Sequence, residues 1–119
     1  MKSSIVLTGN PMSTQHIYLQ KGRMRFMRKE AKERKEQYQW EAKIQYKGKT
    51  IEGDLEIEVR LFFGDKRKRD WDNFHKLSMD ALSDIVWLDD SQVKKATVTL
   101  HYDKANPRTE IDVKVLTRE

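Results

Sequence analysis

The chain contains no cysteine among its 119 residues, so disulfide bonds, thiolate zinc sites and cysteine nucleophiles are excluded. It also has no apolar run near the ~18 residues that a membrane-spanning helix needs. Residues 1–9 carry one cation and only three consecutive apolar residues, too little for a signal peptide. A reducing setting is compatible with these absences, and we expect a cytoplasmic protein with no membrane partner.

Several catalytic and ligand-binding motifs are also missing. There is no glycine-rich phosphate loop and no nucleophile elbow, and His16 and His101 have no ligand partner at the spacing of a zinc site. We therefore expect neither covalent catalysis nor a small-molecule substrate.

The composition is that of a globular protein with a heavily charged surface, because 37% of the residues are hydrophobic and 36% are charged. Its length allows one modest core, so we expect a single domain over residues 1–119.

Hydrophobic periodicity predicts the elements of that domain. Apolar and polar residues alternate over 55–63, and the same pattern recurs over 95–103 and 109–116. A short apolar run over 4–7 predicts a first strand, residues 9–22 are expected to form a loop, and good helix formers fill about 28–45. With a second helix over about 72–85, the order is βαβαββ, an α/β fold with a mixed sheet of about four strands. Asn106 and Pro107 separate the last two strands, which favours a hairpin.

The second predicted helix has an apolar side and an open side. Its apolar residues recur at helical spacing and should face the sheet: Phe74, Leu77, Ser78, Ala81, Leu82 and Ile85. Asp72 and Lys76 then lie on the opposite side as i, i+4 neighbours, about 5–6 Å apart at Cβ. Met79 is expected to point away from the core. His75 is expected on the helix flank, as a DNA contact or a bystander.

Positive charge is concentrated in two segments, although the net charge is only +5. Residues 21–35 hold eight Lys or Arg against two Glu, and four consecutive cations stand at residues 66–69. Such clusters indicate a footprint for nucleic acid, and the alternative is an ordinary basic surface. The candidate DNA-binding residues are Lys21, Arg23, Arg25, Arg28, Lys66, Arg67, Lys68 and Arg69.

Carboxylates directly follow the second basic segment. Asp70 and Asp72 come first, and Asp89 and Asp90 bring a third acid from further along the chain. Mg²⁺ prefers carboxylate oxygens, and a bound Mg²⁺ lowers the pKa of its water and neutralises charge on a cleaved phosphate. Each residue also has an ordinary structural interpretation. Asp72 is a good N-cap, Asp72 and Lys76 suit an exposed helix pair, and Asp89-Asp90-Ser91 suits a turn.

The basic segment, the sequence Asp70-Trp71-Asp72-Asn73-Phe74-His75-Lys76, Asp80-Ala81-Leu82 and Asp89-Asp90-Ser91-Gln92-Val93 together resemble the signature of RusA-type Holliday junction resolvases. The resemblance implies a homodimeric, Mg²⁺-dependent endonuclease of bacterial or phage origin that cuts four-way DNA junctions by paired incisions. Mn²⁺ is a possible substitute for Mg²⁺.

The resemblance also implies roles for individual residues. Asp70, Asp72 and Asp90 match the catalytic, metal-binding carboxylates, Lys76 matches an essential lysine, and Arg69 matches a functional basic residue before the first acid. Two other functions remain open from the residues: a structure-selective DNA-binding protein without cleavage activity, and a metal nuclease acting on forks, flaps or RNA.

Overall fold

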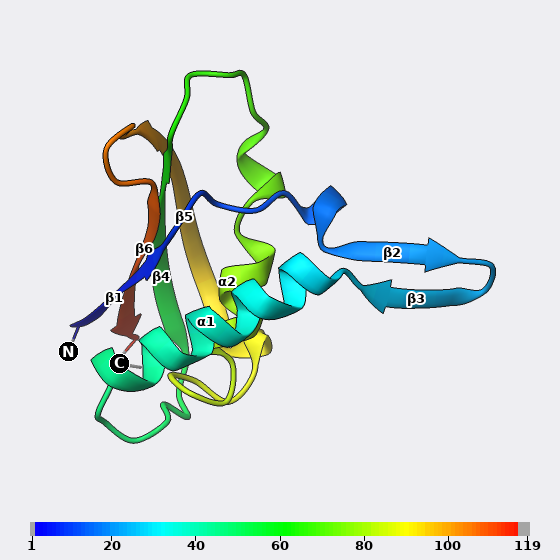
Figure 1. The fold of residues 1–119 in the computed structure, drawn as a ribbon. Coiled ribbons are helices and arrows are strands. Elements are labelled where there is room, and N and C mark those ends of the chain that lie inside the picture. Colours follow the sequence, from blue (N-terminus) through cyan, green and yellow to red (C-terminus); the bar gives the residue numbers. More distant parts are fainter. Residues whose placement is uncertain (1, 117–119) are drawn as a thin grey trace.

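The computed structural model of the chain describes residues 2–116, so Met1 and residues 117–119 of the expected domain lie outside the described part. Four strands form a mixed sheet in the order β1-β6-β4-β5, in which β4 and β5 are parallel and the other neighbours are antiparallel. These strands are β1 (Lys2–Thr8), β4 (Leu55–Phe63), β5 (Val93–Tyr102) and β6 (Arg108–Val115). The remaining elements are α1 (Lys29–Gln45), α2 (Lys76–Leu82) and a separate hairpin of β2 (Tyr18–Lys21) and β3 (Met24–Met27), which projects from the body (Figure 1).

The core lies between the inner face of the sheet and the two helices. Strand β4 runs through the middle of the sheet, and every second side chain along it is buried, from Leu55 to Phe63. Helix α2 contributes Leu77, Ala81 and Leu82 to the same core, and α1 contributes Ala31, Tyr38 and Ala42. The alternation of β4 therefore fixes which side of the sheet the helices cover.

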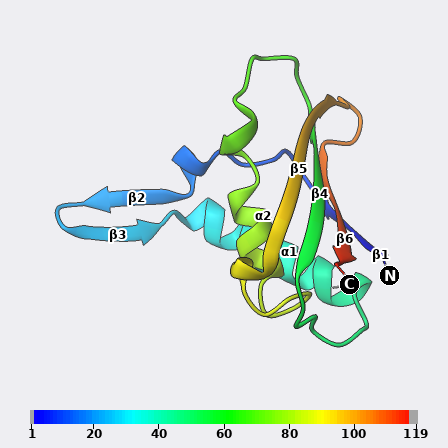
Figure 2. The ribbon, with the colours of Figure 1, turned by 180° about the vertical axis from the view of Figure 1, so that it is seen from behind.

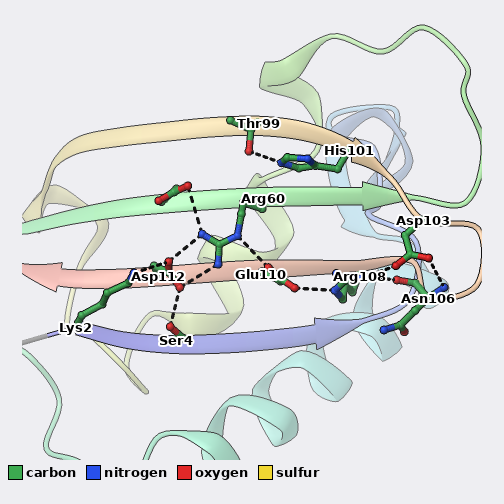
Figure 3. Close-up of polar contacts among 11 residues, drawn as sticks. Lys2, Ser4, Arg60, Thr99, His101, Asp103, Asn106, Arg108, Glu110 and Asp112 are labelled. Atoms are coloured by element: carbon green, nitrogen blue, oxygen red, sulfur yellow. Dashed lines mark hydrogen bonds and ion pairs between the residues drawn. The ribbon is translucent and has the colours of Figure 1, made fainter.

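The outer face of the sheet is polar and is held by a charge network (Figure 3). Arg60 of β4 is at its centre and pairs with Glu110 and Asp112 of β6 and with Glu58 of its own strand. Ser4 and Lys2 of β1 also contact Asp112, so the network joins three strands.

Side chains of α1 cover the free edge of β1. The Gln45 amide donates to the backbone oxygen of Val6 and accepts from its nitrogen, both at 2.7 Å. Glu41 accepts from the backbone nitrogen of Thr8, and Gln37 donates to the oxygen of Thr8. An edge strand with unpaired backbone groups is a template for another strand, and α1 closes this edge.

The predicted fold class is confirmed: the chain has an α/β fold with a mixed four-stranded sheet, and β1, α1, β4, α2, β5 and β6 follow one another in the predicted order. The first helix begins at Lys29 and ends at Gln45, close to the predicted bounds.

Two predictions about the connections between strands are wrong. The expected hairpin of the last two strands does not form, because β4 lies between β5 and β6. The expected loop over 9–22 contains a 3₁₀ helix η1 (Thr14–His16) and then β2, and Gly22 is in the turn to β3 with φ of 63°. Glycine accepts that left-handed conformation without strain.

The second helix is shorter than predicted, since α2 begins at Lys76 and ends at Leu82. A 3₁₀ helix η2 (Trp71–Asn73) precedes it, and Phe74 interrupts the helical path with φ of −127° and ψ of 2°. The Phe74 ring packs edge-on against Phe63, at 5.0 Å between centroids, which keeps η2 separate from α2. Met79 is also placed differently from the prediction, because it is buried at 9% exposure.

Candidate active site

The connection from β4 to α2 carries the second basic segment and the first two candidate acids. Arg69 holds this connection in place, because its guanidinium donates to Asp65 Oδ1 at 2.7 Å and lies 4.1 Å from the centre of the Phe63 ring. The Arg67 backbone N–H and then the Arg69 guanidinium hold the pKa of Asp65 below its usual range. Only 16% of the Arg69 side chain is exposed, so this residue positions the segment just before Asp70.

A small pocket of about 290 Å³ lies beside the start of α2. Its wall combines residues from four parts of the chain: Thr14, Asp72, Asn73, His75, Lys76, Met79, Asp80 and Asp90. The Thr14 hydroxyl donates to the Asn73 backbone oxygen at 2.9 Å, which ties η1 to η2 at the pocket. Three of the predicted catalytic residues, Asp72, Lys76 and Asp90, therefore share one pocket.

Asp90 is the most firmly placed of these acids. It begins the 3₁₀ helix η3 (Asp90–Gln92), and its Oδ1 accepts from the Ser83 hydroxyl at 2.9 Å and from Trp87 Nε1 at 3.0 Å. Within residues 2–116, no hydrogen bond engages its Oδ2. The neighbouring Asp89 instead caps η3 in a capping box with Gln92, and bonds from Ser91 hold its pKa below the usual range. The two adjacent acids thus have different surroundings.

Lys76 is the first residue of α2 and contacts Asp80, one turn further along, at 3.5 Å. Because η2 and α2 are separate, Asp72 and Lys76 are not stacked on one helix as predicted, although both line the pocket. Asp80 was not among the predicted site residues, and its i, i+4 spacing from Lys76 is the signal in the sequence that places it here.

His75 forms part of the pocket wall and is half-buried. Burial lowers its pKa, the charges of Asp72 and Asp80 oppose that shift, and the charge of Lys76 adds to it. Among residues 2–116, its buried Nδ1 has no hydrogen-bond partner. The neutral imidazole is therefore favoured at this position.

Asp70 lies outside this pocket wall. It is exposed at the start of η2, and its side chain makes no capping hydrogen bond. In the described part of the chain, no three His, Asp or Glu side chains are already gathered as metal ligands. The donor type does fit Mg²⁺, because the pocket presents the carboxylates of Asp72, Asp80 and Asp90. Asp70, which precedes η2, and Asp72 within it would have to turn toward Asp90 to complete a metal site.

The cations lie in two places around the acids. Arg67 is highly exposed, Lys68 is exposed, and Lys66 lies 4.9 Å from the centre of the Tyr102 ring. The others are on or next to the projecting hairpin of β2 and β3 (Figure 2). Lys21 ends β2, Arg23 is in the turn, Arg25 stacks on Tyr18, and Arg28 is the residue before α1.

Sequence reasoning did not single out a second hollow, of about 470 Å³, between the segment that follows β1, residues 10–16, and the second basic segment. His16, Arg34, Arg67, Lys68 and Arg69 are among its lining residues. Arg34 donates to the Asn10 backbone oxygen and to the Tyr38 hydroxyl. Both acceptors are neutral, so these hydrogen bonds do not neutralise its positive charge. Its place in the cation-rich stretch 21–35 is the signal that points to it.

None of the helices within residues 2–116 has the length and apolar character that a membrane crossing requires.

Comparison with curated proteins gives no match. The model of one protein family, described as endodeoxyribonuclease RusA, matches residues 8–114 of the 119. That span contains both basic segments, the three 3₁₀ helices that contribute to the pocket and all of the candidate acids. The chain therefore belongs to the RusA family of endodeoxyribonucleases.

Proposed function

We propose that the chain is an Mg²⁺-dependent endonuclease that resolves four-way DNA junctions by paired symmetric nicks, in recombination and repair. Family membership supports endodeoxyribonuclease activity. The observation that carries the finer proposal is the common pocket of Asp72, Lys76 and Asp90, which has exposed cations nearby in sequence. A structural basic loop would not explain why acids from two distant segments meet beside it.

Asp70, Asp72 and Asp90 would hold Mg²⁺, or Mn²⁺ in its place. A bound metal lowers the pKa of its water and neutralises charge that develops on a cleaved phosphate. Asp90 is oriented for this role by Ser83 and Trp87, whereas Asp70 and Asp72 are on an exposed segment that can adjust.

Lys76 would stabilise negative charge on the phosphate. Among residues 2–116, its ammonium forms an ion pair with Asp80 alone, a partly exposed i, i+4 pair that contributes about 0.3–0.5 kcal/mol. An incoming phosphate can therefore displace Asp80 at little cost.

The exposed cations would bind the DNA backbone. Lys66, Arg67 and Lys68 are beside the acids, and Lys21, Arg23, Arg25 and Arg28 extend the basic surface along the hairpin. Arg69 would act by holding the segment that carries Asp70. Most of the affinity would be electrostatic and would fall steeply with salt.

The enzyme would act as a homodimer in the cytoplasm of a bacterium or a phage-infected cell. Two strands related by a two-fold axis need two active sites, and a two-fold dimer supplies them.

A synthetic four-way junction tests the proposal. We expect symmetric nicks in Mg²⁺, and we expect Asp70→Asn and Asp72→Asn to bind the junction without cutting it. Binding of the wild-type protein without cutting in either Mg²⁺ or Mn²⁺ would contradict the proposal. Equal cutting of forks and flaps would contradict the choice of junctions as the substrate.

A further inference from the structure

The second hollow and the pocket beside α2 are lined by side chains of opposite charge. In the part of the chain that the structure describes, no carboxylate lines the second hollow, and its cations are Arg34, Arg67, Lys68 and Arg69. Asp65 pairs with Arg67 at 3.7 Å and with Arg69 at 2.7 Å, but from outside the lining. The pocket presents three carboxylates instead. The pocket therefore suits a cation, and the second hollow suits an anion.

Arg34 is the cation of the hollow that is held in place without being neutralised. Its two hydrogen bonds, to the Asn10 oxygen and the Tyr38 hydroxyl, both come from Nη1. Within residues 2–116, no acid pairs with Arg34 and no hydrogen bond engages Nη2 or Nε. Gly9 has φ of 100°, and a Cβ there would lie 3.1 Å from the guanidinium, so glycine leaves room for it. A guanidinium positioned in advance binds a phosphate with little further loss of conformational freedom.

One wall of the hollow is apolar. Met12 and Phe74 are partly buried and both line it. The edge contact with Phe63, at 5.0 Å between ring centroids, fixes the Phe74 ring. Proteins commonly hold an unpaired base by stacking it on an aromatic side chain. The volume of about 470 Å³ is also in the range for a small organic ligand, about 300–1,000 Å³. A nucleotide uses both walls, whereas a phosphate ion would leave the apolar wall unused.

The second hollow directly adjoins the pocket. Ser13 lines the hollow and Thr14 lines the pocket, and in the same way Phe74 lines the hollow and Asn73 the pocket. The bond from the Thr14 hydroxyl to the Asn73 oxygen, at 2.9 Å, forms the boundary between them. A DNA strand with one phosphate in the pocket can therefore place a neighbouring nucleotide in the hollow.

We propose that the second hollow binds one unstacked nucleotide of the strand that is cut, with its phosphate at Arg34 and its base against Phe74. This inference rests on the proposed function and adds a substrate subsite to it. Unstacking a paired base has a cost, which is lower where pairing and stacking are already disturbed. An opened branch point supplies such a nucleotide and an intact duplex does not, so the subsite favours branched DNA.

A double-mutant cycle between DNA and protein tests the contact with the base. Four-way junctions carry one abasic residue beside the branch point, at each position in turn, and fluorescence anisotropy in EDTA measures binding of the full chain. We expect one position where the ratio of Kd values, abasic over intact, is about fivefold or more larger for the wild type than for Phe74→Leu. Phe62→Leu, on the outer face of the sheet, is the control and should match the wild type. Equal ratios for the wild type and Phe74→Leu at every position would overturn the proposal.

Arg34 tests the contact with the phosphate. We expect Arg34→Gln to weaken junction binding about tenfold or more, the loss for a hydrogen bond to a charged group, and Arg34→Lys to restore part of it. Lys32→Gln removes the same charge from α1 at a residue that lines a different hollow, and should weaken binding much less. Urea unfolding checks that the variants fold. A loss in Arg34→Gln no larger than that in Lys32→Gln would overturn the proposal.

Both binding tests are independent of cleavage, because EDTA removes the divalent metal. A protein that shows the coupling between base and Phe74 but cuts no junction in Mg²⁺ would contradict the proposed function and support the nucleotide site. A protein that cuts junctions without this coupling would overturn the nucleotide site and leave the proposed function in place.

Discussion

Arg60 of β4 and Asp112 of β6 form two side-by-side hydrogen bonds across the outer face of the sheet, with Nη1–Oδ2 at 2.8 Å and Nη2–Oδ1 at 3.1 Å. The Asp112 side chain is 9% exposed, so its charge depends on this partner. The Arg60 hydrogen bonds hold the pKa of Asp112 well below its usual range, although burial acts against them, and bonds from Ser4 and Lys2 add to the effect. The same contact raises the pKa of Arg60.

We expect Asp112→Asn to lower the free energy of unfolding by about 1.5–3 kcal/mol at pH 7, the range for a hydrogen bond to a charged group. A lowered carboxyl pKa stabilises the fold above the unfolded value of about 3.9, and that contribution is lost as the pH falls toward the folded value. The difference in the free energy of unfolding between the wild type and Asp112→Asn should therefore narrow below about pH 4. Urea unfolding at pH 7 and pH 3 measures it, with exposed Glu52→Gln as the control. If the free energies of unfolding of wild type and variant differ by as much at pH 3 as at pH 7, the proposed link between stability and the lowered pKa of Asp112 is contradicted.

Asp89 and Asp90 provide a matched pair for testing the metal site. We expect Asp90→Asn to reduce cleavage by about 100-fold or more while junction binding is retained, because even residues behind metal ligands contribute about 10–100-fold. Asp89→Asn should cut almost normally, because asparagine caps a helix about as well as aspartate does. Single-turnover cleavage rates in Mg²⁺ measure both. Equal losses of cleavage rate in the two variants would indicate that Asp89 and Asp90 both act only by maintaining the structure of η3.

Gln45 offers a test of the covered edge of β1. We expect Gln45→Ala to lower the free energy of unfolding by about 1–2 kcal/mol, because two hydrogen bonds to the Val6 backbone are lost. Lys43→Ala, at an exposed position in the same last turn of α1, is the control. Urea unfolding of both variants measures the effect. A loss no larger than that of the control would show that water replaces the glutamine without penalty.

Patterns that one element carries by itself were predictable from the sequence. The alternation of β4 has a buried and a solvent-facing side, and the helix formers of α1 run without interruption from Lys29 to Gln45. The hairpin of β2 and β3 escaped prediction because it is exposed almost along its length, so it has no apolar alternation.

Relations between elements were less predictable. The short connection from β5 to β6 suggested adjacent strands, yet the position of β4 between them is decided by tertiary packing. The same applies to the site. The residue types indicated carboxylates and a lysine, but the meeting of Asp72, Lys76 and Asp90 depends on the break at Phe74 and on the bonds that Ser83 and Trp87 make to Asp90.

The hairpin can be tested as a DNA contact through salt dependence. Lys21 and Arg23 are exposed at its tip, beside Gly22, and far from the pocket along the chain. If each binds a phosphate, replacing both by glutamine should flatten the slope of log Kd against log salt by about 0.9 per residue. Fluorescence anisotropy with a labelled junction, from low to moderate salt, measures the slope. Lys47→Gln and Lys49→Gln together remove the same charge beyond the opposite end of α1, where no contact is proposed. An equal change in both double variants would mean that net charge alone attracts the DNA, and a change confined to the hairpin pair would establish the hairpin as part of the DNA-binding surface.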